Sequence, residues 1–230
     1  MPRKPRFYLS GVPAHVMQRG HNREPVFFED VDYREYLKIL KKVSDHYQCQ
    51  IHAYVLMTNH LHLLVTPSKK NSISLMFQSI GRLYVTYINK TYKRSGTLWE
   101  GRHKGNIIET ESYFMACMKY IELNPVRSKM VNDPNDYYWS SYAANAYDRP
   151  NIIITKHQLY LSLASENIER LESYRSLFDD KIEDMNLKNI RMSVQSGTPL
   201  GSEKFIKKIE TLFSHSVGYR KRGRPSLKKE

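Results

Sequence analysis

Two histidines that lie two residues apart are the sharpest chemical feature of the sequence. His60 and His62 belong to an apolar run, and side chains alternate between faces along a strand, so both imidazoles would lie on one face, about 7 Å apart at the backbone. Leu61 would then face the core. Two neighbouring imidazoles can bind one divalent ion, and imidazole suits borderline metals such as manganese. Because this spacing is common, two half-exposed structural histidines are the alternative interpretation.

Tyr120 and Asn124 form a second candidate pair. They are four residues apart near the end of a predicted helix, so both would project from one helical face. A phenol beside a metal-activated phosphodiester can act as a nucleophile, and an amide oxygen one turn later can complete the coordination of the ion. The chain has 17 tyrosines, and a tyrosine at helical spacing usually packs in a core, so this pair gains weight only in combination with the histidines.

The elements that must position these residues follow from the apolar pattern. Gln50–Met57 and His60–Thr66 are strand-like runs separated by Thr58-Asn59, which predicts a tight hairpin. Two further short strands are predicted, at His15–Arg19 and within residues 96–109. Apolar residues at helical spacing predict three helices, at Asp32–Tyr47, Ile73–Tyr92 and Ser112–Asn124. This order favours an α+β fold of the ferredoxin-like kind, an antiparallel sheet with helices packed mainly on one face.

The rest of the chain divides by composition. Residues 126–150 are irregular and aromatic, and we expect them to pack back on the sheet, so that a first domain spans residues 1–150. Residues 151–218 are predicted to form a small helical region, in which two short helices around the turn at 196–201 are compatible with a helix-turn-helix. Residues 219–230 are a basic tail whose Arg-Gly-Arg-Pro centre resembles an AT-hook. A solvated basic tail without sequence preference is an equal alternative.

The overall charge points to an anionic partner. The 230 residues carry a formal net charge of +13, of which +8 lies in residues 1–150 and +5 in the last eleven. An excess of this size is the electrostatic footprint of a phosphate binder. The hydrophobic content of 40% excludes extensive disorder. Cys49 and Cys117 are too few for a disulfide framework or a four-thiolate zinc site, and no apolar run reaches the length of a membrane span.

A family resemblance rests on six blocks that occur in order within residues 5–150. The blocks are Val16–Arg23, Asp32–Leu37, Met57–Val65, Leu98–Arg102, Tyr120–Arg127 and Trp139–Tyr142. Two later segments, Pro199–Phe205 and Arg220–Pro225, add to them. Together these segments resemble the REP-associated tyrosine transposases, a branch of the single-tyrosine HUH transposases of bacterial insertion sequences. Six ordered blocks are far more specific than two histidines alone.

The resemblance implies an HUH endonuclease core and a defined reaction. It implies that His60 and His62 are the metal-binding pair, that Tyr120 is the nucleophile, and that Asn124 is the third ligand of Mg²⁺ or Mn²⁺. Related transposases often have glutamine at this last position. Tyr120 would attack a phosphodiester of single-stranded DNA, give a 5′-phosphotyrosine link and a free 3′-hydroxyl, and then reverse onto another end. The implied substrate is a palindromic, hairpin-forming repeat.

Basic residues would bind the DNA backbone while aromatic residues stack on bases. The candidates for backbone contacts are Arg19, His21, Arg23, Arg102, His103, Arg220, Lys221, Arg222 and Arg224. A DNA-binding protein that recognises repeat hairpins without cutting them would have the same basic features, so only the histidine pair and Tyr120 favour an enzyme. An RNA-binding role has no recognisable motif to support it. We expect a cytoplasmic, nucleoid-associated protein that is a monomer or a homodimer.

Overall fold

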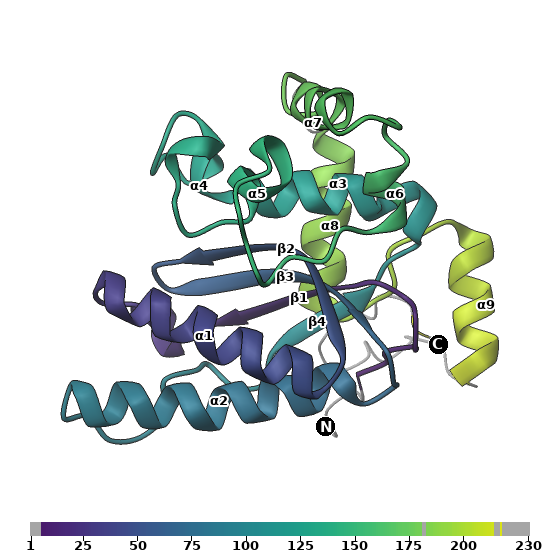
Figure 1. Cartoon of the computed structure of the whole chain (residues 1–230). Coiled ribbons are helices and arrows are strands. Elements are labelled where there is room, and N and C mark those ends of the chain that lie inside the picture. The colour runs from purple at the N-terminus through teal and green to yellow at the C-terminus, as the bar shows by residue number, and fades with distance from the viewer. Residues whose placement is uncertain (1–5, 181–182, 214–216, 218–230) are drawn as a thin grey trace, which may run out of the picture.

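The computed structural model describes residues 6–180, 183–213 and 217, and it contains a four-stranded antiparallel sheet between layers of helices (Figure 1). The strands are β1 (Ala14–Arg19), β2 (Cys49–Met57), β3 (His60–Pro67) and β4 (Lys104–Ile107). Their order in the sheet is β2-β3-β1-β4, and all three neighbouring pairs are antiparallel. The α+β class is confirmed, and so is the hairpin around Thr58-Asn59.

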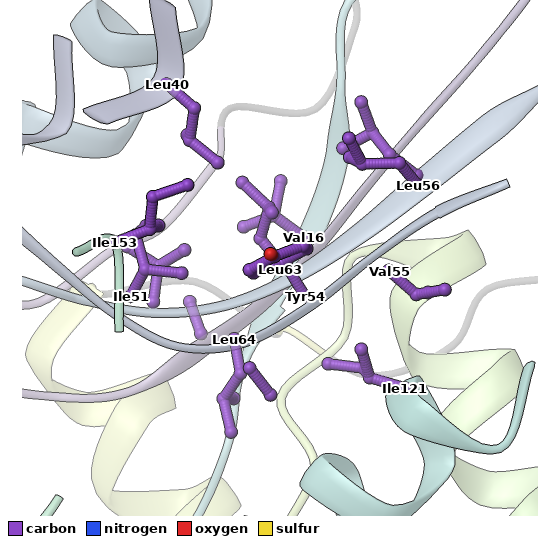
Figure 2. Close-up of a cluster of buried hydrophobic side chains, with 14 of the residues drawn as sticks. Val16, Leu40, Ile51, Tyr54, Val55, Leu56, Leu63, Leu64, Ile121 and Ile153 are labelled. Atoms are coloured by element: carbon purple, nitrogen blue, oxygen red, sulfur yellow. The ribbon is translucent and has the colours of Figure 1, made fainter. Parts of the chain in front are cut away.

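Helices cover both faces of the sheet. In Figure 1, α1 (Asp30–His46) and α2 (Ser72–Thr91) lie side by side on one face, whereas α3 (Thr110–Glu122) and α8 (Asp184–Ser196) lie on the other. This differs from the expectation of helices mainly on one face. The reason is that the strands are apolar on both sides. Figure 2 shows Leu40 of α1 on one side, and Val55 and Leu64 with Ile121 of α3 on the other, and all four are buried.

The helix α1 begins at Asp30, two residues before the predicted start at Asp32. Asp32 lies in the first turn of α1 and accepts hydrogen bonds from the backbone N–H groups of Phe28 and Glu29 at 2.9 and 3.0 Å. Its carboxylate also accepts hydrogen bonds from two hydroxyls, those of Tyr87 in α2 and of Tyr92 just after α2. It therefore caps α1 from inside the helix and ties α1 to α2.

Pro125 lies at the boundary between two helices. The helix α3 ends at Glu122, and a short helix, α4 (Asn124–Arg127), follows with Pro125 in its first turn. Proline is tolerated there because the first N–H groups of a helix have no intrahelical partner. Asn124 is thus the first residue of α4.

The aromatic segment after α4 lies along the outer edge of β2, as expected. It contains a 3₁₀ turn, η2 (Pro134–Asp136), and α5 (Tyr142–Tyr147). The backbone N–H of Leu56 donates to the carbonyl of Trp139 at 2.9 Å, and the N–H of Ser141 donates to the carbonyl of Tyr54 at 3.0 Å. Further on, the N–H of Thr155 donates to the carbonyl of Ile51 at 2.7 Å.

The remaining described chain is helical and contacts the sheet. It forms α6 (Gln158–Leu161), α7 (Asn167–Ser176), α8 and α9 (Glu203–Phe213). Between α8 and α9, the N–H of Leu200 donates to the carbonyl of Ile107 at 3.0 Å, and Leu200 accepts from the N–H of Glu109 at 2.7 Å. The two helices expected around residues 196–201 are present, and their connection also pairs with the end of β4. No described helix is long and apolar enough to cross a membrane.

Candidate active site

Strands β1 and β3 bring three histidines together on the face that α3 covers. Met17 of β1 is opposite His62 of β3, and His15 is opposite Leu64. Nε2 of His15 lies 2.8 Å from Nδ1 of His62, and the ring centroids of His60 and His62 are 5.3 Å apart. The two histidines expected to share a face therefore do so, and His15 joins them.

The helix α3 places Tyr120 against this group. The ring centroid of Tyr120 is 5.5 Å from that of His15 and 5.8 Å from that of His62. The next residue, Ile121, packs into the apolar core of the sheet, which fixes the direction in which Tyr120 projects. The structure thus brings the predicted nucleophile next to one of the two predicted metal ligands.

Arg127 lies over the ring of Tyr120. Its guanidinium carbon is 3.9 Å from the ring centroid, and Nη2 donates to the Tyr120 carbonyl at 2.9 Å. Burial lowers the pKa of Arg127, but an arginine stays charged at neutral pH. Sequence reasoning gave no role to Arg127 or His15. The spacing of seven residues, about two helical turns, could have indicated Arg127, whereas His15 becomes visible only through the register of β1 and β3.

Burial keeps the three imidazoles neutral. It lowers the pKa of His15 to about 3 and that of His60 to about 4, and it holds the pKa of His62 well below the ordinary value. The positive charge of Arg127 adds to the effect on His15 and His62, and that of Arg19 adds to the effect on His60 and His62. Neutral imidazole is the form that binds a metal ion.

The expected ligands carry nitrogen and oxygen donor atoms of the kinds that bind divalent ions. Nδ1 of His60 is held by Oδ1 of Asn59 at 2.7 Å, and Nδ1 of His62 by His15. Within the described part of the chain, Nε2 of each ring has no hydrogen-bond partner. Nδ2 of Asn124 donates to the carbonyls of Tyr120 and Ile121 at 3.2 and 3.3 Å, which leaves its Oδ1 available.

The set of ligands at this site is limited. Residues 6–180, 183–213 and 217 contain no group of three or more His, Cys, Asp or Glu side chains that could hold a metal ion. A metal site here would therefore be built on the two imidazoles of His60 and His62, with an amide oxygen, water or substrate completing the coordination.

The predicted DNA contacts have different surroundings. Arg19 ends β1 opposite His60, and His21 and Arg23 are exposed in the turn η1 (His21–Arg23). Arg102 is exposed before β4. The remaining candidates, Arg220, Lys221, Arg222 and Arg224, lie outside the described residues.

His103 is placed in the core instead of at the surface. Its ring is 5% exposed, lies 4.4 Å from the ring of Phe77 between centroids, and shares a hydrogen bond of 3.1 Å with the Tyr8 hydroxyl. Burial lowers the pKa of His103 to about 3. Because the ring is enclosed and one of its nitrogens already bonds to Tyr8, the expected contact of His103 with the DNA backbone does not fit its position.

The model of a protein family described as "Transposase IS200 like" matches residues 8–124, which is more than half of the chain. The chain belongs to the IS200-like transposases. The matched span includes the whole sheet, the histidine pair and Tyr120, and it ends at Asn124. The family expected from the sequence blocks is thereby confirmed.

Two solved structures are similar to the transposase. A REP-associated tyrosine transposase bound to a REP hairpin is 18% identical, with a TM-score of 0.56, and the match covers 68% of this chain and 93% of that chain. A putative transposase from Deinococcus radiodurans is also 18% identical, with a TM-score of 0.37 and coverage of 50% and 91%. No curated protein matches the sequence. The first of the two structures shows that the transposase shares its fold.

Proposed function

We propose that the transposase cuts and rejoins single-stranded DNA with Tyr120 as the nucleophile. The observation that supports this most directly is the position of the Tyr120 ring, which lies 5.8 Å from the buried His62 ring, between centroids, and 3.9 Å from the Arg127 guanidinium carbon. A phenol next to two neutral imidazoles and a fixed positive charge has the surroundings that nucleophilic attack on a phosphodiester needs.

The proposed reaction conserves the energy of the phosphodiester bond. The Tyr120 hydroxyl loses its proton and its oxygen attacks the phosphorus, while the bond to the 3′-oxygen breaks and that oxygen takes up a proton. The products are a 5′-phosphotyrosine link and a free 3′-hydroxyl. Attack by another 3′-hydroxyl on the phosphotyrosine then rejoins the DNA and frees Tyr120.

The residues around Tyr120 have separate roles in this proposal. Arg127 holds the tyrosine from one side through its ring contact and the hydrogen bond to the Tyr120 carbonyl. Arg19 would bind a phosphate near the histidines, which its position opposite His60 supports. His60, His62 and Asn124 would hold Mg²⁺ or Mn²⁺. When bound, such an ion stabilises the negative charge that develops on the phosphate oxygens.

We further propose that the substrate is a palindromic, hairpin-forming DNA repeat with a single-stranded segment. Support comes from the net charge of +13 and from the fold shared with a transposase that was solved bound to a REP hairpin. The exposed His21, Arg23 and Arg102 offer contacts to the DNA backbone. Sequence-independent binding of this kind depends on phosphate neutralisation and weakens as salt is added.

The proposed nucleophile can be tested by substitution. The protein is incubated with single-stranded hairpins from its own genome and Mn²⁺ or Mg²⁺, and covalent adducts are counted on a denaturing gel. Tyr120→Phe should form no adduct while it binds the DNA within a few-fold of the unaltered protein, since only one oxygen is lost.

Tyr113→Phe is the matched control, because Tyr113 lies on α3 two helical turns, roughly 10 Å along the helix axis, before Tyr120, and it should form the adduct normally. An adduct with Tyr120→Phe would assign the nucleophile to another tyrosine. If the unaltered protein forms no adduct with any hairpin or ion, the protein binds such DNA without cutting it.

A further inference from the structure

Asn59, in the turn between β2 and β3, makes two hydrogen bonds that together fix the state of His60. Its Nδ2 donates to the backbone carbonyl of Arg23 at 2.8 Å. A carbonyl oxygen can only accept, so this bond determines which way the amide points. Oδ1 of Asn59 must then accept from Nδ1–H of His60, 2.7 Å away. His60 is thereby held in the tautomer that has its lone pair on Nε2.

His15 has the corresponding position behind His62. Its ring is fully buried, and its Nε2 lies 2.8 Å from Nδ1 of His62. If His62 donates this hydrogen bond, its own Nε2 is left with a free lone pair. If His15 donates it, Nε2 of His62 carries a proton and has no lone pair for a ligand bond.

A purely structural role does not explain why position 15 holds a histidine. Its Nδ1 is buried and has no hydrogen-bond partner among the described residues, and an unsatisfied buried polar atom costs roughly 1–3 kcal/mol. An aliphatic residue at this position in β1 would avoid that cost only by leaving Nδ1 of His62 without its partner. The presence of an imidazole with one satisfied nitrogen, aimed at His62, therefore indicates a role in orienting His62.

We propose that Asn59 and His15 are positioning residues that hold His60 and His62 through Nδ1 and leave both Nε2 atoms free for one divalent ion. This inference rests on the function proposed above. Side chains that hold the second nitrogen of a metal-binding histidine fix its tautomer and orientation, and their loss commonly lowers metal affinity about 10–100-fold.

Asn59 also connects the histidine to the loop that is expected to touch DNA. The carbonyl it binds belongs to Arg23, and both Asn22 and Arg23 have the left-handed backbone conformation, with φ of 52° and 62°. Residues other than glycine adopt this conformation infrequently, asparagine more often than most. One amide thus fixes the loop and the metal-binding histidine together.

The test measures Mn²⁺ binding to the full-length, metal-free protein without DNA, by calorimetry and by the electron paramagnetic resonance signal of free Mn²⁺. Asn59→Ala and His15→Leu remove the acceptors and should weaken Mn²⁺ binding about 10–100-fold. His15→Gln keeps an oxygen acceptor close to the original atom, so it should bind Mn²⁺ within about fivefold of the unaltered protein. Asn59→Asp keeps the acceptor for His60 but loses the donor to the Arg23 carbonyl, so it should recover part of the affinity that Asn59→Ala loses. His15→Leu should melt close to the temperature of the unaltered protein, because it removes the unsatisfied Nδ1 of His15 but leaves Nδ1 of His62 without its partner.

His60→Ala serves as the reference for loss of a ligand. If the unaltered protein and His60→Ala both fail to bind Mn²⁺, the metal site itself is refuted and the positioning role with it. If His60→Ala loses binding while Asn59→Ala and His15→Leu bind normally, only the positioning role is refuted. Equal losses in the alanine or leucine variants and in their acceptor-keeping partners would also overturn it, because the acceptor would then not be what matters.

Discussion

Arg127 combines favourable and unfavourable interactions within one side chain. The contact with the Tyr120 ring is of a kind that contributes up to about 2 kcal/mol when desolvated, and the hydrogen bond to the Tyr120 carbonyl adds to it. Its Nε and Nη1 are buried and have no partner among the described residues, which costs a similar amount. Because these contributions have opposite signs, Arg127 is a good probe of function.

We predict that Arg127→Met changes the free energy of unfolding by less than about 1 kcal/mol, because the opposing contributions are both lost. The same substitution should slow formation of the covalent DNA adduct at least tenfold, since the positive charge beside the attacking ring disappears. Arg127→Lys should restore only part of the rate, because an ammonium keeps the positive charge but lacks the planar guanidinium fork. Urea denaturation and timed denaturing gels measure the two effects. A Met variant that cuts DNA at the normal rate would contradict the role given to Arg127.

Among the elements, α3, α5 and α7 are joined by one buried carboxylate. Glu122, next to Ile121 on α3, is fully buried. It accepts hydrogen bonds from Ser141 Oγ at 2.5 Å, Asn145 Nδ2 at 2.8 Å and the Tyr174 hydroxyl at 2.7 Å. Burial raises the pKa of Glu122 above its ordinary value of 4.5, although these donors act in the opposite direction.

This raised pKa predicts a pH dependence of stability. Between the ordinary pKa and the raised one, Glu122 binds more protons in the folded than in the unfolded protein, so its contribution to stability falls as pH rises through that window. Glu122→Gln should abolish this part of the pH dependence. Glu122→Ala should lower the free energy of unfolding by at least about 2 kcal/mol, because the donors lose their acceptor. Urea midpoints at pH 5 and pH 8 test both. Parallel pH profiles for Glu122→Gln and the unaltered protein would contradict the prediction.

The loop that follows β1 depends on a glycine. A Cβ at Gly20 would lie 2.3 Å from the Glu24 carbonyl oxygen and 2.8 Å from a methyl group of Val26. We therefore expect Gly20→Ala to lower the free energy of unfolding by roughly 1–3 kcal/mol, as overpacking commonly does, and to weaken Mn²⁺ binding by displacing the Arg23 carbonyl.

Gly81, within α2, is the control for this substitution. A Cβ there meets nothing within 4 Å, so Gly81→Ala should raise the free energy of unfolding by roughly 0.5–1 kcal/mol. Chemical denaturation of the two variants gives the comparison. Equal effects of the two substitutions would show that the space around Gly20 does not matter.

The elements could be predicted from the sequence to the extent that local pattern defines them. The β2–β3 hairpin and the helix with Tyr120 follow from alternation and helical spacing, and the same alternation put His60 and His62 on one face. The contributions of His15 and Glu122 could not be predicted. Each depends on a partner far away in the sequence, His62 and Tyr174 respectively, and strand register and helix docking are not encoded in local periodicity.

At the scale of the whole molecule, we expect the basic tail and the proposed site to contribute to DNA binding in different ways. The described part of the chain contains the proposed site, whereas residues 220–229 add six basic side chains. We predict that deleting residues 220–230 weakens binding of all single-stranded DNA similarly and lowers the slope of log affinity against log salt by at most about 4, at about 0.7 for each phosphate contact.

Binding titrations at several salt concentrations, with a repeat hairpin and a scrambled strand, measure this slope. If the tail instead recognises a particular DNA sequence, its deletion would remove the preference for the repeat hairpin and leave the slope of log affinity against log salt unchanged.

Both outer edges of the sheet are engaged by the chain's own backbone. Trp139, Ser141 and Thr155 hydrogen-bond to β2 on one edge, and Leu200 pairs with the end of β4 on the other. Unpaired edge strands invite pairing with other copies, which leads to aggregation. At these positions the described part of the transposase offers no such edge, so two copies of the sheet cannot pair edge to edge there.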